Sequence, residues 1–196
     1  MMHNRSILVF AGPNGSGKST ITGQSPLVGA YVNADQIEKT LKCDSLLAAK
    51  VATATREYLL SQEESFTFET VMSTPRNIEL LRNARLQGYY ITCIYVLTKH
   101  PEINVRRVKQ RYASGGFNVP EEKVITRFHR AMLLIPELKE VCSRLLIYDN
   151  SAEKGEGEPA LIAEIIDGIE SIKPSVHWSE NAIRNLLAGK YLAEPL

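Results

Sequence analysis

The stretch that decides the fold runs from residue 7 to residue 20 and reads ILVFAGPNGSGKST. Its first five residues are continuously apolar, which is typical of a strand that is buried on both faces of a parallel sheet. Residues 12–19, GPNGSGKS, then match the pattern GxxxxGK[ST] at every fixed position. An apolar strand that runs directly into this pattern predicts a phosphate-binding loop at the strand's carboxyl end.

The residue types in this loop fit the binding of a nucleoside triphosphate. Glycines allow the backbone conformations that point successive N–H groups inward at an anion. Lys18 can reach the β- and γ-phosphates, and the Ser19 hydroxyl can ligate Mg²⁺. We therefore expect ATP and Mg²⁺ as cofactors, with Ser19 as the metal ligand. The predicted nucleotide-binding residues are Gly12, Pro13, Asn14, Gly15, Ser16, Gly17, Lys18, Ser19, Thr20 and Asn150.

Outward from this loop, apolar runs alternate with helical patterns, which favours βαβ units and a parallel sheet. The predicted strands are residues 7–11, 31–33, 66–69, 90–97 and 145–148. The predicted helices are residues 44–62, 75–87, 103–113, 121–141 and 160–169, with a short one near 182–187. We expect a doubly wound α/β domain with a mainly parallel sheet of about five strands. This domain would span residues 1–172, with a helical Gly-Gly lid at about 101–141, and residues 173–196 would form a C-terminal helical tail.

A first acid follows the second predicted strand in the sequence N-A-D, residues 33–35. Ligands of α/β proteins bind at the carboxyl edge of the sheet, so Asp35 is placed to touch a substrate there. It could take the proton of a substrate hydroxyl as the γ-phosphoryl group leaves ATP. The alternative is structural, because Asp35 followed by Glu38 also resembles a helix N-cap with a capping-box acid.

A second acid lies at the end of the third predicted strand, in F-E-T, residues 68–70. The alternation of Phe66 and Phe68 assigns one face of the strand to the core, which leaves Glu69 on the other face at the active edge. A solvated acid at a strand end is the alternative.

Basic residues are spaced at helical intervals on both sides of Gly115-Gly116. Arg107 and Arg111 are i, i+4 neighbours before the glycines. Lys123, Arg127 and Arg130 follow after them at i, i+4 and i+7. Two basic faces joined by a flexible turn predict a lid that closes on phosphates and supplies arginines to the transition state. The alternative is that these are ordinary solvated helix faces.

The last predicted strand ends in an acid as well, because residues 145–149 read LLIYD. This segment could be a Walker-B-like strand with Asp149 at the magnesium site. We prefer an adenine-side role for the loop at residues 149–151, since Asp35 is nearer in sequence to the phosphate-binding loop.

Composition narrows the classes of partner. The chain has 196 residues and a formal net charge of +1, so no global field attracts it to nucleic acid or anionic lipid. Its longest apolar runs are well short of the roughly 18 residues that span a membrane. The three cysteines form no CxxC pair, which favours reduced, buried thiols. We expect a cytoplasmic protein with no membrane contact, for which nucleic acid is an improbable partner.

Taken together, these segments resemble the zeta-toxin family of P-loop kinases, specifically its short chromosomal members. The resemblance covers roughly residues 5–151 and is specific as an ordered set of motifs. These are AGPNGSGKST at 11–20, NADQI at 33–37, FETV at 68–71, RVxxRYxxGGFxVP at 107–120, RFxR at 127–130 and YDNS at 148–151.

The resemblance implies an ATP-dependent phosphotransferase, and the characterised toxins of the family act on UDP-N-acetylglucosamine. By this likeness Asp35 would be the catalytic base, and Glu69 and Thr70 would face the substrate. Lys18 and Arg111, together with Arg127 or Arg130, would hold the phosphates. A small antitoxin protein would be a further partner.

Three functions follow as hypotheses. The first is a kinase for a small molecule or a sugar nucleotide, transferring the γ-phosphoryl group of ATP to an alcohol group. The second is a polynucleotide 5′-hydroxyl kinase, which would share the loop, the base and the lid. The third belongs to a different class: an ATP-binding module that switches a partner without phosphorylating anything.

Overall fold

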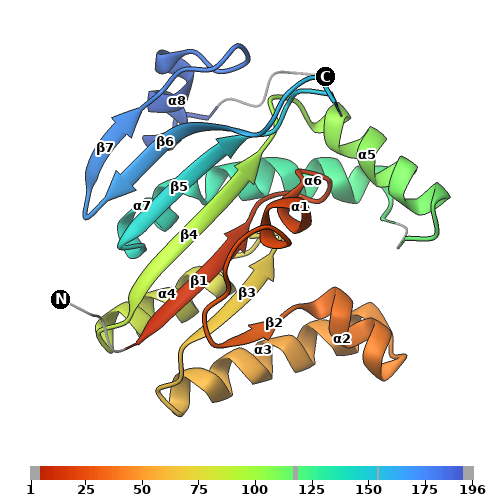
Figure 1. The fold of residues 1–196 in the computed structure, drawn as a ribbon, viewed down its shortest axis with the longest axis vertical. Coiled ribbons are helices and arrows are strands. Elements are labelled where there is room, and N and C mark those ends of the chain that lie inside the picture. The colour runs from red at the N-terminus through yellow and green to blue at the C-terminus, as the bar shows by residue number, and fades with distance from the viewer. Residues whose placement is uncertain (1–4, 117–118, 154, 192–196) are drawn as a thin grey trace.

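The computed structural model describes residues 5–116, 119–153 and 155–191. Its centre is a seven-stranded sheet with the order β2-β3-β1-β4-β5-β6-β7 (Figure 1). The strands are β1 (Ser6–Ala11), β2 (Ala30–Val32), β3 (Phe66–Thr70), β4 (Tyr90–Leu97), β5 (Arg144–Asp149), β6 (Ala160–Ile166) and β7 (Ile169–Ile172). The pairs from β2 to β5 are parallel, and β6 and β7 add an antiparallel edge. The predicted doubly wound, mainly parallel α/β fold is confirmed, with seven strands instead of about five.

The two additional strands replace a predicted helix. Residues 160–169 were expected to be helical, and this prediction is wrong: they form β6 and the start of β7. Asp167 and Gly168 both have positive φ, 47° and 84°, and join the two strands in a tight hairpin. An Asp-Gly pair between apolar runs is the sequence signature of such a turn, because both central residues of a type I′ turn need positive φ.

The helices are α1 (Lys18–Thr22), α2 (Ala34–Leu41), α3 (Ser45–Ser61), α4 (Arg76–Leu86), α5 (Pro101–Ala113), α6 (Glu121–Leu133), α7 (Ile135–Val141) and α8 (Glu180–Leu187). The single helix predicted at residues 121–141 is in fact two. α6 ends at Leu133, and α7 begins with Pro136 in its first turn. A proline has no N–H to donate, so it is tolerated at a helix start and interrupts a continuous helix.

The main core lies between the sheet and the helices that cover one of its faces, and Figure 1 shows α4, α6 and α7 behind the sheet. Alternate residues of the central strands point into it, as the period of two in a strand requires. Those of β4 are Ile91, Cys93, Tyr95 and Leu97, all fully buried. Phe128 of α6 closes the core from the helical side.

The C-terminal segment contributes to the same core. Trp178 and, from α8, Ile183, Leu186 and Leu187 are buried in it. Ser179 caps α8 by accepting a hydrogen bond from the backbone N–H of Ala182. Within the described residues, no helix combines the length and the apolar character that crossing a bilayer requires.

Helices α5 and α6 have a small apolar cluster of their own, separate from the main core. It consists of Val105, Val108 and Val124, with Val119 and Ile125 packed against it. Lys109 of α5 and Glu121 of α6 form an ion pair at 2.7 Å across this unit. α5 ends at Ala113 with Ser114 as its C-cap, and Gly115 follows with a φ of 88°. Positions 117 and 118 of the connecting turn lie outside the described residues.

Candidate active site

The loop after β1 has the backbone conformation that its glycines were expected to give. Gly12, Gly15 and Gly17 all have positive φ, at 139°, 77° and 98°. A side chain at Gly12 would collide with the carbonyl oxygen of Val96, and one at Gly17 would collide with the amide of Asn150. Positive φ and close packing therefore both exclude other residues here. The loop is held against β4 and against the segment after β5.

Lys18 lies at the centre of the site. Its ammonium folds back over the loop and donates to the carbonyl oxygens of Gly12 at 2.8 Å and Pro13 at 3.0 Å. Burial lowers the pKa of Lys18 to about 8, and the charges of Glu69 and Asp35 partly oppose this shift while Arg111 adds to it. Both predicted acids and one lid arginine are thus close enough for their charges to act on Lys18.

Glu69 meets the loop directly. The Ser19 hydroxyl donates to Glu69 Oε2 at 3.2 Å, and the Tyr31 hydroxyl donates to Glu69 Oε1 at 2.7 Å. The side-chain amide of Asn33 in turn donates to the Tyr31 oxygen at 2.8 Å. This chain of contacts joins the ends of β2 and β3 to the loop.

Tyr31 is a site residue that the sequence reading missed. Burial raises its pKa above the ordinary value, and the adjacent Glu69 carboxylate adds to this increase. The signal lies in strand register, because Tyr31 pairs with Thr67, two residues before Glu69. Residues two apart on neighbouring strands share a face of the sheet. That register cannot be read from either segment alone.

Asp35 lies in the first turn of α2, and the structural alternative for it is wrong. The N-cap of α2 is Asn33, whose Oδ1 accepts from the backbone N–H groups of Asp35 at 2.8 Å and Gln36 at 3.2 Å. The carboxylate of Asp35 is exposed, and no hydrogen bond or ion pair occupies it within the part of the chain that the structure describes. It is free to meet a substrate.

Thr70, also predicted to face the substrate, takes part in a local turn. Its Oγ1 accepts from the backbone N–H of Met72 at 3.1 Å and from the side-chain amide of Asn77 at 2.7 Å. Met72 has a φ of 52°, in the left-handed region that residues other than glycine seldom adopt. These bonds fix how the chain leaves β3 beside Glu69.

The lid arginines are placed differently from one another. Arg127 of α6 is half-buried and lies 3.5 Å from Asn14 of the loop, measured from Nη1 to Oδ1. Arg111 of α5 is exposed, and its charge acts on Lys18. Arg130 is exposed at the end of α6, and nothing in the described ranges pairs with its guanidinium. Of the two candidates on α6, Arg127 is therefore the one that reaches the loop.

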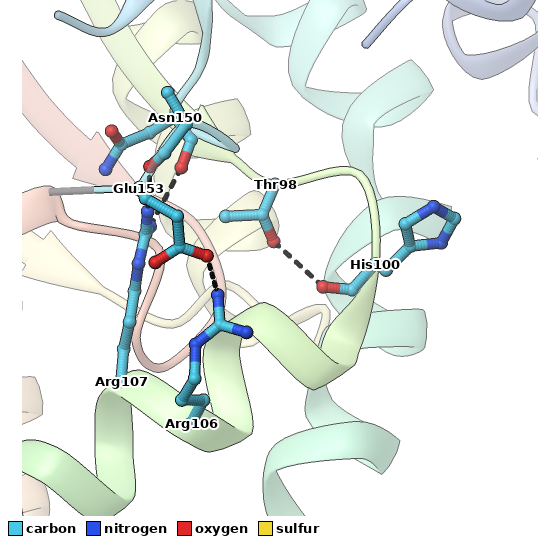
Figure 2. A network of polar contacts seen from close by, with 7 residues as sticks. Thr98, His100, Arg106, Arg107, Asn150 and Glu153 are labelled. Carbon is cyan, nitrogen blue, oxygen red and sulfur yellow. Dashed lines mark hydrogen bonds and ion pairs between the residues drawn. The ribbon is translucent and has the colours of Figure 1, made fainter. Parts of the chain in front are cut away.

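Asn150 supports the loop from the far side of β4. Its side-chain amide donates to the carbonyl oxygen of Ser16 at 2.7 Å. The guanidinium of Arg107, in α5, donates to the carbonyl oxygens of Asn150 at 2.8 Å and of Ala152 at 2.6 Å. The neighbouring Arg106 forms an ion pair with Glu153 (Figure 2). Arg107 is thus a tie between the lid and the β5–β6 connection, unlike the free basic face predicted for it.

A second support, Asn104, was also missed in the sequence. It lies in α5 and is completely buried. Its side-chain amide donates to the carbonyl oxygen of Asn14 at 2.7 Å, and its Oδ1 accepts a hydrogen bond from the Thr98 hydroxyl. An asparagine among valines on a lid helix is the only local signal. Its function depends on a loop that lies 90 residues earlier in the chain.

Asp149 ends β5, which β4 separates from β1. It is buried and accepts hydrogen bonds from Ser151 and, at 2.8 Å, from the Ser175 hydroxyl. The Walker-B-like alternative for it is therefore not met. The strand beside β1 on the other side is β3, so Glu69 is the acid that touches Ser19.

The donors present fit a triphosphate and a divalent cation. The Ser16 hydroxyl is buried inside the loop, and no described residue pairs with it. A buried hydroxyl without a partner costs free energy, which a phosphate oxygen could offset. Ser19 and Glu69 offer a hydroxyl and a carboxylate oxygen, the hard ligands that Mg²⁺ prefers.

The fold and the loop together define a P-loop kinase architecture. The chain belongs to the zeta toxin family: the family model, described as "Zeta toxin", matches residues 38–155, more than half of the chain. This match contains Glu69, Arg111, Arg127 and Asn150, and it begins after the loop and after Asp35.

The chain is also similar to individual proteins. An uncharacterized protein of Haemophilus influenzae is 28% identical over 134 residues, which are 65% of this chain and 95% of that protein. A crystal structure of AvrRxo1-ORF1 with AvrRxo1-ORF2 and sulphate ions matches with a TM-score of 0.70 at 14% identity. It aligns with 98% of this chain, which spans 66% of that structure's chain, just under two thirds.

The PezAT chromosomal toxin–antitoxin system of Streptococcus pneumoniae contains a chain that matches with a TM-score of 0.55 at 13% identity. This match covers 95% of the present chain and 85% of the other. At such identities, both structural matches establish the common fold.

Proposed function

We propose that this protein is a kinase that transfers the γ-phosphoryl group of ATP to a hydroxyl group of a small molecule or a sugar nucleotide. The observation that carries this proposal is the phosphate-binding loop with Lys18 folded over it and Glu69 in contact with Ser19. Asp35 and Arg111 are close enough for their charges to act on Lys18. Membership of the zeta toxin family supports the same class of reaction.

The loop supplies binding and charge stabilisation. Backbone N–H groups of the loop hold the phosphates, with none from Pro13, and Lys18 exchanges its bonds to Gly12 and Pro13 for bonds to the phosphate oxygens. Ser19 and Glu69 would hold Mg²⁺. The cation, when bound, neutralises charge on the β- and γ-phosphates.

Asp35 is the proposed general base. Its unoccupied carboxylate accepts the proton of the acceptor hydroxyl while the acceptor oxygen bonds to the γ-phosphorus. The bond between this phosphorus and the oxygen that bridges it to the β-phosphate breaks, and ADP leaves with that electron pair. Arg111 and Arg127 of the lid stabilise the charge on the transferring group, and Tyr31 holds Glu69 in position.

Replacing Asp35 with Asn tests the base. Because Asn33 caps α2, we expect the free energy of unfolding to change by less than about 1 kcal/mol. Single-turnover transfer is expected to fall by about 10²–10⁴, the usual contribution of a positioned base, while ATP affinity is retained. Transfer at the wild-type rate would remove Asp35 from the mechanism. Asp44→Asn at the cap of α3 is the matched control.

The lowered pKa of Lys18 predicts that the affinity for ATP depends on pH. The free protein has a Lys18 pKa of about 8, and bound phosphates favour the charged amine and raise this pKa. The association constant should be level below pH 8 and then fall by about tenfold per pH unit until the pKa of the complex is reached. Equilibrium titrations from pH 6.5 to about 9.5 test this. Lys18→Arg keeps its charge and should lose the decrease; a decrease of the same size in that variant would assign it to another group.

The family resemblance suggests which acceptors to test first. UDP-N-acetylglucosamine is the first acceptor to test, followed by simple sugars and alcohols, and an oligonucleotide with a 5′-hydroxyl. Phosphorylation of the oligonucleotide alone would establish the polynucleotide kinase alternative. ATP binding without transfer to any acceptor would favour the switch module.

We also propose an antitoxin partner. A structural neighbour from S. pneumoniae belongs to a toxin–antitoxin system, and this chain shares its fold. Co-expression with the products of the genes that flank its own, followed by size-exclusion chromatography, tests the proposal. A stable complex that inhibits transfer is expected, and two separate peaks with unchanged transfer would contradict it.

A further inference from the structure

A groove outside the candidate active site contains a buried arginine that forms no ion pair with any described residue. It lies between α3 and α4 and has a volume of about 380 Å³. Arg56 of α3 lines it and is only 7% exposed. One end of the groove is next to the candidate active site, because Asn77 lines the groove and its side-chain amide also donates to Thr70.

The contacts of Arg56 do not neutralise the positive charge of its guanidinium group. One guanidinium nitrogen donates to the Thr53 hydroxyl at 3.0 Å, and the group stacks on the Phe68 ring at 5.0 Å. Its Nε is buried and bonds to no described residue. Across residues 5–116, 119–153 and 155–191, no carboxylate lies within ion-pair distance of it. Burial lowers the Arg56 pKa to about 10.

A second cation faces the same groove. Arg76, in the first turn of α4, lines it and is exposed. After burial, the charge of Glu57 raises the pKa of Arg56 and that of Arg76 lowers it. Two guanidinium groups that repel one another gain most from an oxyanion between them, since charge-assisted bonds from arginine to carboxylate or phosphate are the strong ones. Buried charges are otherwise paired in proteins.

The rest of the lining indicates what would accompany the oxyanion. Asn77, Asn83 and Gln87 present side-chain amides, which both donate and accept hydrogen bonds. Glu57 and Glu79 add acceptors. Such a lining suits a body that carries several hydroxyl groups. We propose that the groove between α3 and α4 binds a sugar phosphate or a sugar acid, with its oxyanion between Arg56 and Arg76.

The test is site-resolved NMR on the full chain, so that phosphate binding at the loop is not confused with binding in the groove. The Arg56 Nε–Hε cross-peak is followed during titration with glucose 6-phosphate, with glucuronate and with uncharged glucose. Its assignment comes from sequential connectivities, with Arg56→Lys as confirmation. A saturable shift is expected with at least one of the two anions and not with glucose. The phosphate and carboxylate arms identify which oxyanion is preferred.

Two variants complete the test. Arg76→Gln should weaken the anion's affinity by about tenfold or more, the worth of a charge-assisted bond. Arg82 lies on the same helix but outside the groove, where it pairs with Glu137. The control variant Arg82→Gln should therefore leave the anion's affinity unchanged. The proposal is overturned if neither anion gives a saturable shift up to about 10 mM, a very weak affinity. It is equally overturned if Arg76→Gln binds as tightly as the wild type.

Discussion

Lys18→Ala is expected to reduce phosphoryl transfer by at least about 10³, because it removes a charged donor from the position where the phosphates bind. In the free protein this ammonium already occupies the loop, bonded to the carbonyl oxygens of Gly12 and Pro13. ATP affinity should fall as well, since the remaining loop N–H groups lack a formal charge. Single-turnover transfer and equilibrium ATP binding measure the two effects separately.

The same variant should fold normally. The folded-state pKa of Lys18, about 8, lies below its ordinary value of 10.5, so folding disfavours the charged amine. This penalty is present in full below pH 8 and disappears as the pH rises above 10.5. At neutral pH, removing the amine therefore relieves a cost that offsets its lost hydrogen bonds, and we expect the free energy of unfolding to stay within about 1 kcal/mol. Lys50→Ala, exposed on α3, is the control. Transfer by Lys18→Ala at the wild-type rate would refute the assignment of the loop.

Arg127→Ala is expected to lower turnover by about 10³–10⁵, the range for an arginine that stabilises the transferring phosphoryl group. The side chain starts 3.5 Å from Asn14, so it is already at the loop before any nucleotide binds. Arg111→Ala should behave similarly, because its charge reaches Lys18. Stability should change little in either variant, since neither guanidinium belongs to the apolar clusters.

Arg130→Ala provides a matched comparison on the same helix. Its guanidinium is exposed and three residues farther along α6, so we expect less than about a tenfold loss of turnover, one decade being about 1.4 kcal/mol. Steady-state kinetics on the three variants decide between a lid that acts on phosphates and a pair of solvated basic faces. Full activity in Arg111→Ala and Arg127→Ala would establish the solvated faces.

Much of the central fold could be predicted because its signals are local. The apolar run before Gly12 and the run at residues 90–97 indicate buried parallel strands, and both lie where expected. The hairpin of β6 and β7 was missed because apolar residues at 160–169 fit a helical period as well as an alternating one. Only the turn at Asp167-Gly168 separates the two patterns.

In the candidate site, too, the local motif could be predicted from the sequence and the contacts between distant residues could not. The loop from Gly12 to Ser19 is a contiguous motif, and it connects β1 to the start of α1 as the sequence predicts. The contact of Ser19 with Glu69 joins residues 50 positions apart, and its recognition needs the order of β1 and β3 in the sheet. Tyr31 and Asn104 act only through partners brought to them by folding. Such supporting residues carry no pattern of their own.

The central claim is that the γ-phosphoryl group of ATP is transferred to a hydroxyl group. The most direct test incubates the purified protein with Mg²⁺, ATP labelled in the γ-phosphoryl oxygens, and a mixture of UDP-N-acetylglucosamine, sugars and alcohols, and then analyses the products by mass spectrometry. We predict an acceptor that is heavier by one labelled phosphoryl group, formed by the wild type and by Lys50→Ala and absent with Lys18→Ala. If the label appears only in inorganic phosphate, or stays in ATP, with every acceptor class including the 5′-hydroxyl oligonucleotide, the protein is not a kinase of this kind.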